Sequence, residues 1–341
     1  MIEAVDIHKQ FRTPVAKEGP FAGIRSLFAR DYRVKEAVNG ISFTLPEGEF
    51  AGYIGPNGAG KSTTIKMLTG ILRPTSGLVT IGGMNPHKER RKVARRLGVV
   101  FGHRSQLWWD LPVKESFELL GAMYSVPAAA RRKREGEMIE LLEMSSFLDT
   151  PVRKLSLGQR MRADLAAAML HDPDILFLDE PTIGLDANAK ESIRGFLRTL
   201  NREYGKTVLL TTHDMDDIER LCSRVLVIND GMLRYDGTIP ELRERIGLPT
   251  VIRIRFQREP NVPESAAVGL TPLRASVEES AADLAGAPFR IRKWEGRQLT
   301  VECNRSEVTA MEVLRAVSEW GDVEDVETSE PEFEEIVRRI Y

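Results

Sequence analysis

The sequence contains little that would suit a secreted or membrane-spanning chain. Only two of its 341 residues are cysteines, and Cys222 and Cys303 show no metal-binding or redox spacing, so we expect reduced thiols in a cytoplasmic protein. No apolar run approaches the roughly 18 residues that a membrane helix requires. We expect no signal peptide, because a strand is predicted directly from Ile2. The formal net charge of −2 argues against nucleic acid as the main partner.

A glycine-rich loop lies between a predicted strand that ends at Ile54 and a predicted helix that follows it. The pattern G-x-x-x-x-G-K-S in this context is highly specific for a nucleoside triphosphate site. Its backbone N–H groups point at phosphate oxygens, its lysine reaches the β- and γ-phosphates, and its serine hydroxyl binds Mg²⁺. The predicted phosphate-binding residues are Gly55, Asn57, Gly58, Gly60, Lys61, Ser62 and Thr63.

A short apolar run at residues 175–178 predicts a strand that is buried on both faces of a parallel sheet. It ends in Asp179 and Glu180, and carboxylates at the carboxyl end of such a strand lie beside the phosphate loop. We expect Asp179 to hold Mg²⁺ through water and Glu180 to orient and polarise the attacking water. A strand that ends in a solvated acidic turn is the alternative.

A second anion site is predicted at the start of the helix that ends near Leu170. The run Leu155-Ser156-Leu157-Gly158-Gln159-Arg160 places a serine hydroxyl and a glycine N–H at a helix N-terminus. One chain has no obvious use for two phosphate sites at this separation, whereas two chains facing head to tail can cap each other's nucleotide. We therefore predict nucleotide contacts from Ser156, Gly158 and Gln159 to a second copy of the chain.

These motifs, in this order and spacing, resemble the ATP-binding subunits of ABC transporters over residues 1 to about 245. The resemblance rests on GPNGAGKST, LSLGQR, ILFLDEPT, the run Ile183-Gly184-Leu185-Asp186, and His213. It implies an ATP hydrolase that uses Mg²⁺, with Asp186 in a loop at the dimer interface and His213 at the γ-phosphate. The catalytic residues would be Glu180, His213 and Lys61, and the metal would be held by Ser62 and Asp179.

The sequence departs from that family at two positions. Leu157 stands where the family's LSGGQ signature has a glycine, although Ser156 and Gly158 retain the phosphate-facing groups. His103 stands where the family has a glutamine that helps to hold Mg²⁺, and a neutral imidazole could ligate or accept a hydrogen bond there. We predict His103 as a metal-site residue, with Gln106 as the alternative if the loop is displaced.

The adenine ring needs an aromatic surface, which the family usually supplies from the end of the first strand. Tyr32 precedes Ala37-Val38 at the usual offset and is predicted to stack on adenine, with Phe11 as the alternative. Either side chain could instead belong to the core.

An insertion at about residues 12–35 separates the first two predicted strands. Its apolar residues recur at helical spacing among arginines, which predicts a basic amphipathic helix at a membrane or partner surface, or one packed on its own domain. Together with residues 106–112, which include Trp108 and Trp109, the insertion resembles a bacterial exporter group that includes viologen and multidrug exporters. The tryptophans would face the membrane subunit, unless they are core residues. The apolar helix positions are Phe21, Ile24, Leu27 and Phe28.

The chain is predicted to form two domains, as its length and its content of 29% charged and 42% apolar residues allow. Residues 1–245 form an α/β P-loop cassette with a helical subdomain at about 104–170. Residues 246–341 show strand and helix patterns in the order β-α-β-β-α-β-α. This order predicts a small α+β, ferredoxin-like accessory domain.

We therefore predict the ATP-hydrolysing subunit of a bacterial ABC exporter, working as a homodimer with integral membrane permease subunits. It would lie at the cytoplasmic face of the inner membrane, held there through the permeases. The alternative is a soluble ABC ATPase that acts on a non-transport assembly, although the chain shows neither the second cassette nor the long coiled coil typical of that class.

Overall fold

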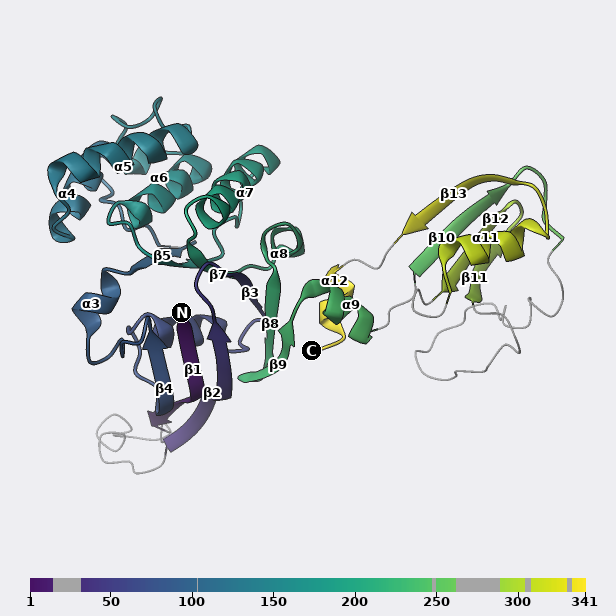
Figure 1. Cartoon of the computed structure of the whole chain (residues 1–341), viewed down its shortest axis with the longest axis horizontal. Coiled ribbons are helices and arrows are strands. Elements are labelled where there is room, and N and C mark those ends of the chain that lie inside the picture. The colour runs from purple at the N-terminus through teal and green to yellow at the C-terminus, as the bar shows by residue number, and fades with distance from the viewer. Residues whose placement is uncertain (15–31, 103, 247–249, 262–288, 304–307, 330–332) are drawn as a thin grey trace, which may run out of the picture. The chain divides into compact units, whose positions relative to one another are not determined.

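A computed structural model describes residues 1–14, 32–102, 104–246, 250–261, 289–303, 308–329 and 333–341. It contains two compact units (Figure 1), and the second begins somewhat before the boundary predicted after residue 245. The first unit consists of Met1–Ile239 with Ile340–Tyr341, and the second of Pro240–Arg339.

A six-stranded sheet forms the centre of the first unit, in the order β5-β6-β7-β3-β8-β9. The pairs from β5 to β8 are parallel, and β9 pairs antiparallel with β8. Every residue of β3 and β7 is buried, as expected for apolar strands covered on both faces. The strands are β3 (Phe50–Ile54), β5 (Leu97–Phe101), β6 (Ile175–Asp179), β7 (Thr207–Thr211), β8 (Arg224–Asn229) and β9 (Met232–Gly237).

A second, antiparallel sheet has the order β2-β1-β4, with β1 (Ile2–Pro14), β2 (Tyr32–Leu45) and β4 (Ser76–Ile81). The pairing of β1 with β2 continues to Pro14 and Tyr32. Both ends of the insertion predicted at 12–35 are therefore strand: residues 12–14 extend β1, residues 32–35 extend β2, and the two segments pair with each other. The amphipathic helix predicted around Phe21–Phe28 lies outside the described residues.

The helices of the first unit fall into two sets. Beside the central sheet lie α2 (Lys61–Leu68), α3 (Arg90–Ala94), α7 (Ala187–Arg202) and α8 (Met215–Leu221). The other set, which we call the helical group, packs together on the side of the central sheet away from β1, β2 and β4 (Figure 1). It comprises α4 (Val113–Met123), α5 (Ala128–Leu141), the 3-10 turn η1 (Val152–Lys154) and α6 (Leu157–Met169), all within the region predicted as helical.

The second unit contains an antiparallel sheet in the order β11-β12-β10-β13, with α11 packed on one face. This is the strand order of a ferredoxin-like fold, and all four predicted strands are confirmed. The helix predicted between the first two strands of this unit lies outside the described residues. The elements are α9 (Ile239–Ile246), β10 (Thr250–Phe256), β11 (Phe289–Glu295), β12 (Gln298–Cys303), α11 (Ala310–Ser318), β13 (Val323–Ser329) and α12 (Phe333–Arg338).

None of the described helices combines the length and the apolar character that a bilayer crossing requires.

A buried carboxylate joins two loops at the edge of the central sheet. Asp217 of α8 is fully buried, and its Oδ1 accepts a hydrogen bond from Arg194 Nε of α7 at 2.6 Å. Its other oxygen accepts from the hydroxyl of Thr182 and, at 3.3 Å, from that of Thr212. Thr182 follows the carboxylates at the end of β6, and Thr212 precedes His213. One side chain therefore sets the relative position of both loops.

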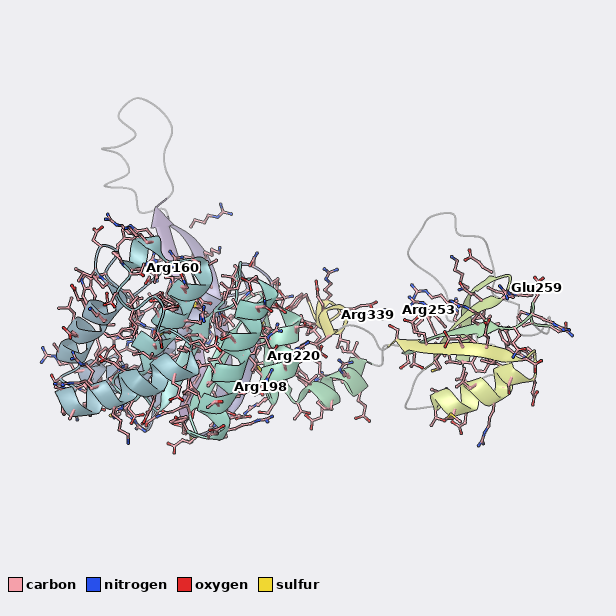
Figure 2. All side chains as sticks on the ribbon, turned by 90° about the horizontal axis from the view of Figure 1, so that it is seen from above. Arg160, Arg198, Arg220, Arg253, Glu259 and Arg339 are labelled. Atoms are coloured by element: carbon pink, nitrogen blue, oxygen red, sulfur yellow. The ribbon has the colours of Figure 1, made fainter. Side chains whose placement is uncertain are left out.

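We expect Asp217→Ala to lower the free energy of unfolding of the first unit by about 3 kcal/mol, because it leaves the Arg194 guanidinium buried without its closest partner. The matched control is Arg198→Ala on α7, the helix that carries Arg194. Arg198, labelled in Figure 2, makes a 3.0 Å ion pair with Glu191 at the surface, so its loss should cost less than about 1 kcal/mol. Urea unfolding would measure both changes, and equal effects would contradict the role assigned to Asp217.

Candidate active site

The phosphate loop turns from β3 into α2 at Gly60, whose φ is +105°. A Cβ atom at Gly60 would lie 2.4 Å from the Ala37 carbonyl oxygen, so only glycine lets the loop pass β2 this closely. Lys61 Nζ donates to the carbonyl oxygens of Gly55 (2.5 Å) and Pro56 (3.2 Å). Burial lowers the pKa of Lys61, and the nearby carboxylates of Glu180 and Asp179 oppose that shift.

A cavity of about 260 Å³ lies over this loop. Glu180 lines it from the end of β6, and Phe11 and Lys35 line it from β1 and β2. The structure thus brings most of the predicted phosphate-binding residues to one hollow with a predicted catalytic carboxylate. The loop residues at the cavity are Asn57, Gly58, Gly60, Lys61, Ser62 and Thr63.

Phe11 is the aromatic residue that the structure places at this cavity. It is 40% exposed, and Lys9 Nζ lies 5.4 Å from the centre of its ring. Tyr32, the predicted stacking residue, begins β2 and pairs with Pro14 through its backbone, but its side chain lies outside the described residues. Phe11, the alternative to Tyr32 as the adenine-stacking residue, is therefore the one of the two that the structure describes at the site.

The two predicted Mg²⁺ ligands with described side chains lie close together. Ser62 Oγ is 3.5 Å from Asp179 Oδ2, and the hydroxyl of Thr211 donates to Asp179 Oδ1 at 2.5 Å. A carboxylate and a hydroxyl beside a phosphate loop form the oxygen-donor set that Mg²⁺ prefers, so these residues fit the ion. His103 lies outside the described residues. The Gln106 side-chain amide donates to the Asp164 carbonyl oxygen of α6 at 2.9 Å, so it is engaged with the helical group.

Glu180 and His213 form a pair at the ends of neighbouring strands. Glu180 Oε1 lies 2.9 Å from His213 Nε2, and the Glu180 N–H donates to the Thr211 carbonyl oxygen at 2.8 Å. The backbone of Glu180 has a φ of +56°, in the left-handed region that a residue with a Cβ atom rarely adopts. Such strain is typical of functional sites. It turns the side chain towards the cavity, which Glu180 lines.

The predicted signature residues begin α6. Ser156 is its N-cap: Ser156 Oγ accepts from the Gln159 N–H at 3.2 Å, and Gln159 Oε1 accepts from the Ser156 N–H at 3.0 Å. This capping box holds Ser156 and Gly158 at the positive end of the helix, where phosphate oxygens bind. Asp186 caps α7 in the same manner, since its Oδ1 accepts from the Ala189 N–H at 2.9 Å.

The unusual signature residue Leu157 packs against the loop before α7. A Cβ atom at Gly184, whose φ is +70°, would lie 3.1 Å from Leu157 Cδ2. The leucine therefore brings the signature into contact with the loop that carries Asp186. Sequence analysis identified the departure at Leu157 but not this contact, because the two segments are distant in the chain.

Asp164 of α6 is a further polar residue that the sequence analysis missed. It is only 5% exposed, and its Oδ1 accepts hydrogen bonds from Ser105 Oγ (2.9 Å) and the Gln106 N–H (3.0 Å). Burial raises the pKa of Asp164 to about 6, while these bonds and Arg160 act in the opposite direction. A lone acidic residue within the small apolar run 163–168 was the available signal.

Comparisons with known proteins agree with this geometry. A family model described as ABC transporter matches residues 38–183. The chain is 32% identical over 309 residues to the daunorubicin resistance ATP-binding protein DrrA3 of Streptomyces coeruleorubidus, covering 89% of this chain and 91% of that protein. It is 39% identical to the Nod factor export ATP-binding protein I of Ralstonia nicotianae, over 65% of this chain and 68% of that protein.

Among solved structures, the chain is similar to the dimeric ATP-binding cassette MJ0796 in a post-hydrolysis state bound to ADP and Pi. The TM-score is 0.58 and the identity 28%, over 70% of this chain and 98% of that chain. The chain therefore belongs to the ABC transporter family, as an ATP-binding subunit that hydrolyses ATP.

The raised pKa of Asp164 predicts how its replacement changes stability with pH. Because the pKa in the folded state, about 6, exceeds the ordinary value of 3.8, ionisation of Asp164 costs stability as the pH rises through 6. Asp164→Asn keeps an acceptor oxygen and cannot ionise. Relative to the unmodified chain, the variant should therefore gain up to about 3 kcal/mol in free energy of unfolding between pH 4 and pH 8. Parallel pH profiles in urea unfolding would contradict this prediction.

Proposed function

We propose that this chain is the ATPase subunit of an exporter, and that two copies bind head to tail so that each closes the other's nucleotide site. The observation that supports the proposal is an anion site away from the phosphate loop. The cavity over the loop is lined, among the described residues, from β1, β2, residues 57–63 and Glu180. Ser156 and Gly158, held by the capping box, are not among these described lining residues, and we infer that a second chain brings its signature to the nucleotide.

The chain's own residues supply positioning and charge. The phosphate-loop N–H groups and Lys61 bind the β- and γ-phosphates. Ser62 and Asp179 would hold Mg²⁺, which when bound neutralises charge on the phosphate oxygens. Glu180 accepts a hydrogen bond from the attacking water and holds it in line. His213, 2.9 Å from Glu180 Oε1, links that carboxylate to the position of the γ-phosphate.

Phe11 is a described aromatic residue that lines the cavity, and we assign it as an adenine-stacking surface. Stacking on a flat aromatic face is compatible with any purine base, so this contact would contribute affinity rather than strong selectivity.

The relatives named for Nod factor export and daunorubicin resistance point to export as the direction of transport. The partners would be permease subunits in the inner membrane, contacted at its cytoplasmic face. Exposed apolar residues on α4 and in the loop before it support this partner. Trp108 is 37% and Trp109 54% exposed, so the alternative that both are core residues is wrong.

The loop that carries these tryptophans is bonded to α4, which has exposed apolar residues of its own. The Trp108 N–H donates to Ser116 Oγ of α4 at 3.3 Å, and Leu119 and Met123 of the same helix are 42% and 70% exposed. Leu119 and Met123 lie four residues apart and so share one helix face. We assign Trp108, Trp109, Leu119 and Met123 as the permease-facing surface. Exposed apolar side chains of this kind suit the apolar face of an amphipathic helix. We propose that a membrane subunit supplies that helix.

We expect Glu180→Gln to bind ATP with unchanged affinity but to turn over at least about a hundredfold more slowly, because the water loses its polarising carboxylate. A dimer should then accumulate with ATP and Mg²⁺ and should be visible by size-exclusion chromatography with light scattering. Adding Ser156→Ala to this variant should weaken the dimer without changing ATP binding to the monomer. Near-normal hydrolysis by Glu180→Gln, or an equally strong dimer with Ser156→Ala, would contradict the proposed function.

We expect Leu119→Glu with Met123→Glu to abolish copurification with the permease subunits while leaving ATP binding intact. Both side chains are already exposed, so the charges should not unfold the helical group, but they cannot be buried against a permease helix. Tyr204→Glu is the control, since Tyr204 is 43% exposed and follows α7 outside the helical group. Copurification that survives the double substitution would rule out this surface.

A further inference from the structure

The loop that follows β5 is bound to the signature helix largely through one buried residue, Asp164. We propose that Asp164 is a positioning residue that fixes residues 104–107 to α6, so that this loop and the signature serine move as one body. The inference rests on the proposed function, because it concerns how the signature reaches the nucleotide of the second copy.

Three hydrogen bonds join the loop to α6 at this point. Asp164 Oδ1 accepts from Ser105 Oγ and from the Gln106 N–H, and Gln106 Nε2 returns a bond to the Asp164 carbonyl oxygen. Ser105 Oγ also accepts from the Leu107 N–H at 3.1 Å. The loop is thus wrapped around one carboxylate that is 5% exposed, where each bond is shielded from water.

The same face of α6 makes a second contact with the loop. Ser156, Arg160 and Asp164 are four residues apart, so they follow one another along one side of the helix. The Arg160 guanidinium (labelled in Figure 2) lies 5.9 Å from the centre of the Trp109 ring. Movement of Trp109 on the permease-facing surface would therefore act directly on α6, whose N-cap Ser156 is proposed to contact the partner's nucleotide.

The beginning of the loop is attached to the strand end that carries the catalytic carboxylates. The Gly102 N–H donates to the Asp179 carbonyl oxygen at 2.7 Å. A Cβ atom at Gly102 would lie 2.5 Å from the Glu180 carbonyl oxygen, so the backbones are in direct contact. The loop thus leaves the site of hydrolysis and, a few residues later, binds the signature helix. Asp164 provides the second of these attachments.

The geometry also supplies a matched pair of variants. Both bonds from the loop go to the same oxygen of Asp164, and an asparagine amide oxygen can accept both. Asp164→Asn should therefore keep the attachment, whereas Asp164→Ala removes both of these bonds and leaves only the bond from Gln106 Nε2 to the backbone carbonyl oxygen. Neither substitution touches the phosphate loop or the residues of the β6 end.

The test uses the full-length chain and Mg²⁺–ATP. For Asp164→Ala we expect kcat to fall at least about tenfold, because small misplacements of a catalytic group have effects of this size. The Kd for ATP, measured on the monomer with a fluorescent ATP analogue, should stay within twofold. Hydrogen exchange of the peptide that spans residues 104–109 should accelerate in Asp164→Ala and stay as in the unmodified chain in Asp164→Asn, which should also keep kcat within twofold.

Two outcomes would overturn the proposal. One is a normal kcat and normal exchange in Asp164→Ala. The other is a parallel loss of kcat and of ATP affinity, which would show that Asp164 only supports the fold. If Asp164→Ala does not fold, Ser105→Ala removes one donor and should show a smaller change of the same kind. Failure of the proposed function can be distinguished from failure of this inference. If the proposed function is wrong, the unmodified chain will not hydrolyse ATP and the Glu180→Gln variant will not dimerise. The exchange measurement would still show whether Asp164 attaches the loop to α6.

Discussion

Parallel pairing of β6 with β7 is the interaction on which the candidate active site depends. In this register Asp179 lies opposite Thr211, so the carboxylate receives the threonine hydroxyl. Glu180, one residue after Asp179, and His213, two residues after Thr211, then lie within 2.9 Å of each other. β7 also pairs with β3, which ends at the phosphate loop. A shift of one residue in either pairing would send these side chains to the opposite face of the sheet. The apolar, fully buried strands therefore determine the chemistry as well as the core.

Buried carboxylates then connect this edge to its surroundings. Asp217 joins the loops that carry Thr182 and Thr212, and the positive charge of Arg194 compensates the negative charge of its carboxylate. Asp164 joins the loop after β5 to α6, and burial of its carboxyl raises its pKa to about 6. A hydrophobic residue at either position would pack with less electrostatic cost, but it would not define a unique arrangement of two loops. These two residues relate the ends of β5, β6 and β7 to α6 and to the loops that carry Thr182 and Thr212.

The Pro240–Arg339 unit is built by a different logic from the cassette. Its strands alternate between buried and exposed residues, so one face of the sheet packs on α11 and the other carries charges such as Arg253 and Glu327. The alternation of β10, β11 and β12 was visible in the sequence and predicted these three strands, and residues 323–328 were predicted as a fourth strand. Alternation shows which face of a strand is buried, but it does not show which strands are neighbours. The pairing order followed only from the ferredoxin-like fold that the order of strands and helices suggested.

The sequence by itself determined the features whose geometry is local. The phosphate loop, the capping box at Ser156 and the strand that ends in Asp179 and Glu180 each depend on contacts within a few residues, so their spacing was sufficient to predict them. The tertiary structure alone decided which distant segments meet. It placed Phe11 at the cavity, Leu157 against Gly184, and Asp164 and Asp217 between loops, since a buried polar residue takes its meaning from partners far along the chain. The exposed positions of Trp108 and Trp109 were settled in the same way, because burial is a property of the folded chain and not of a motif.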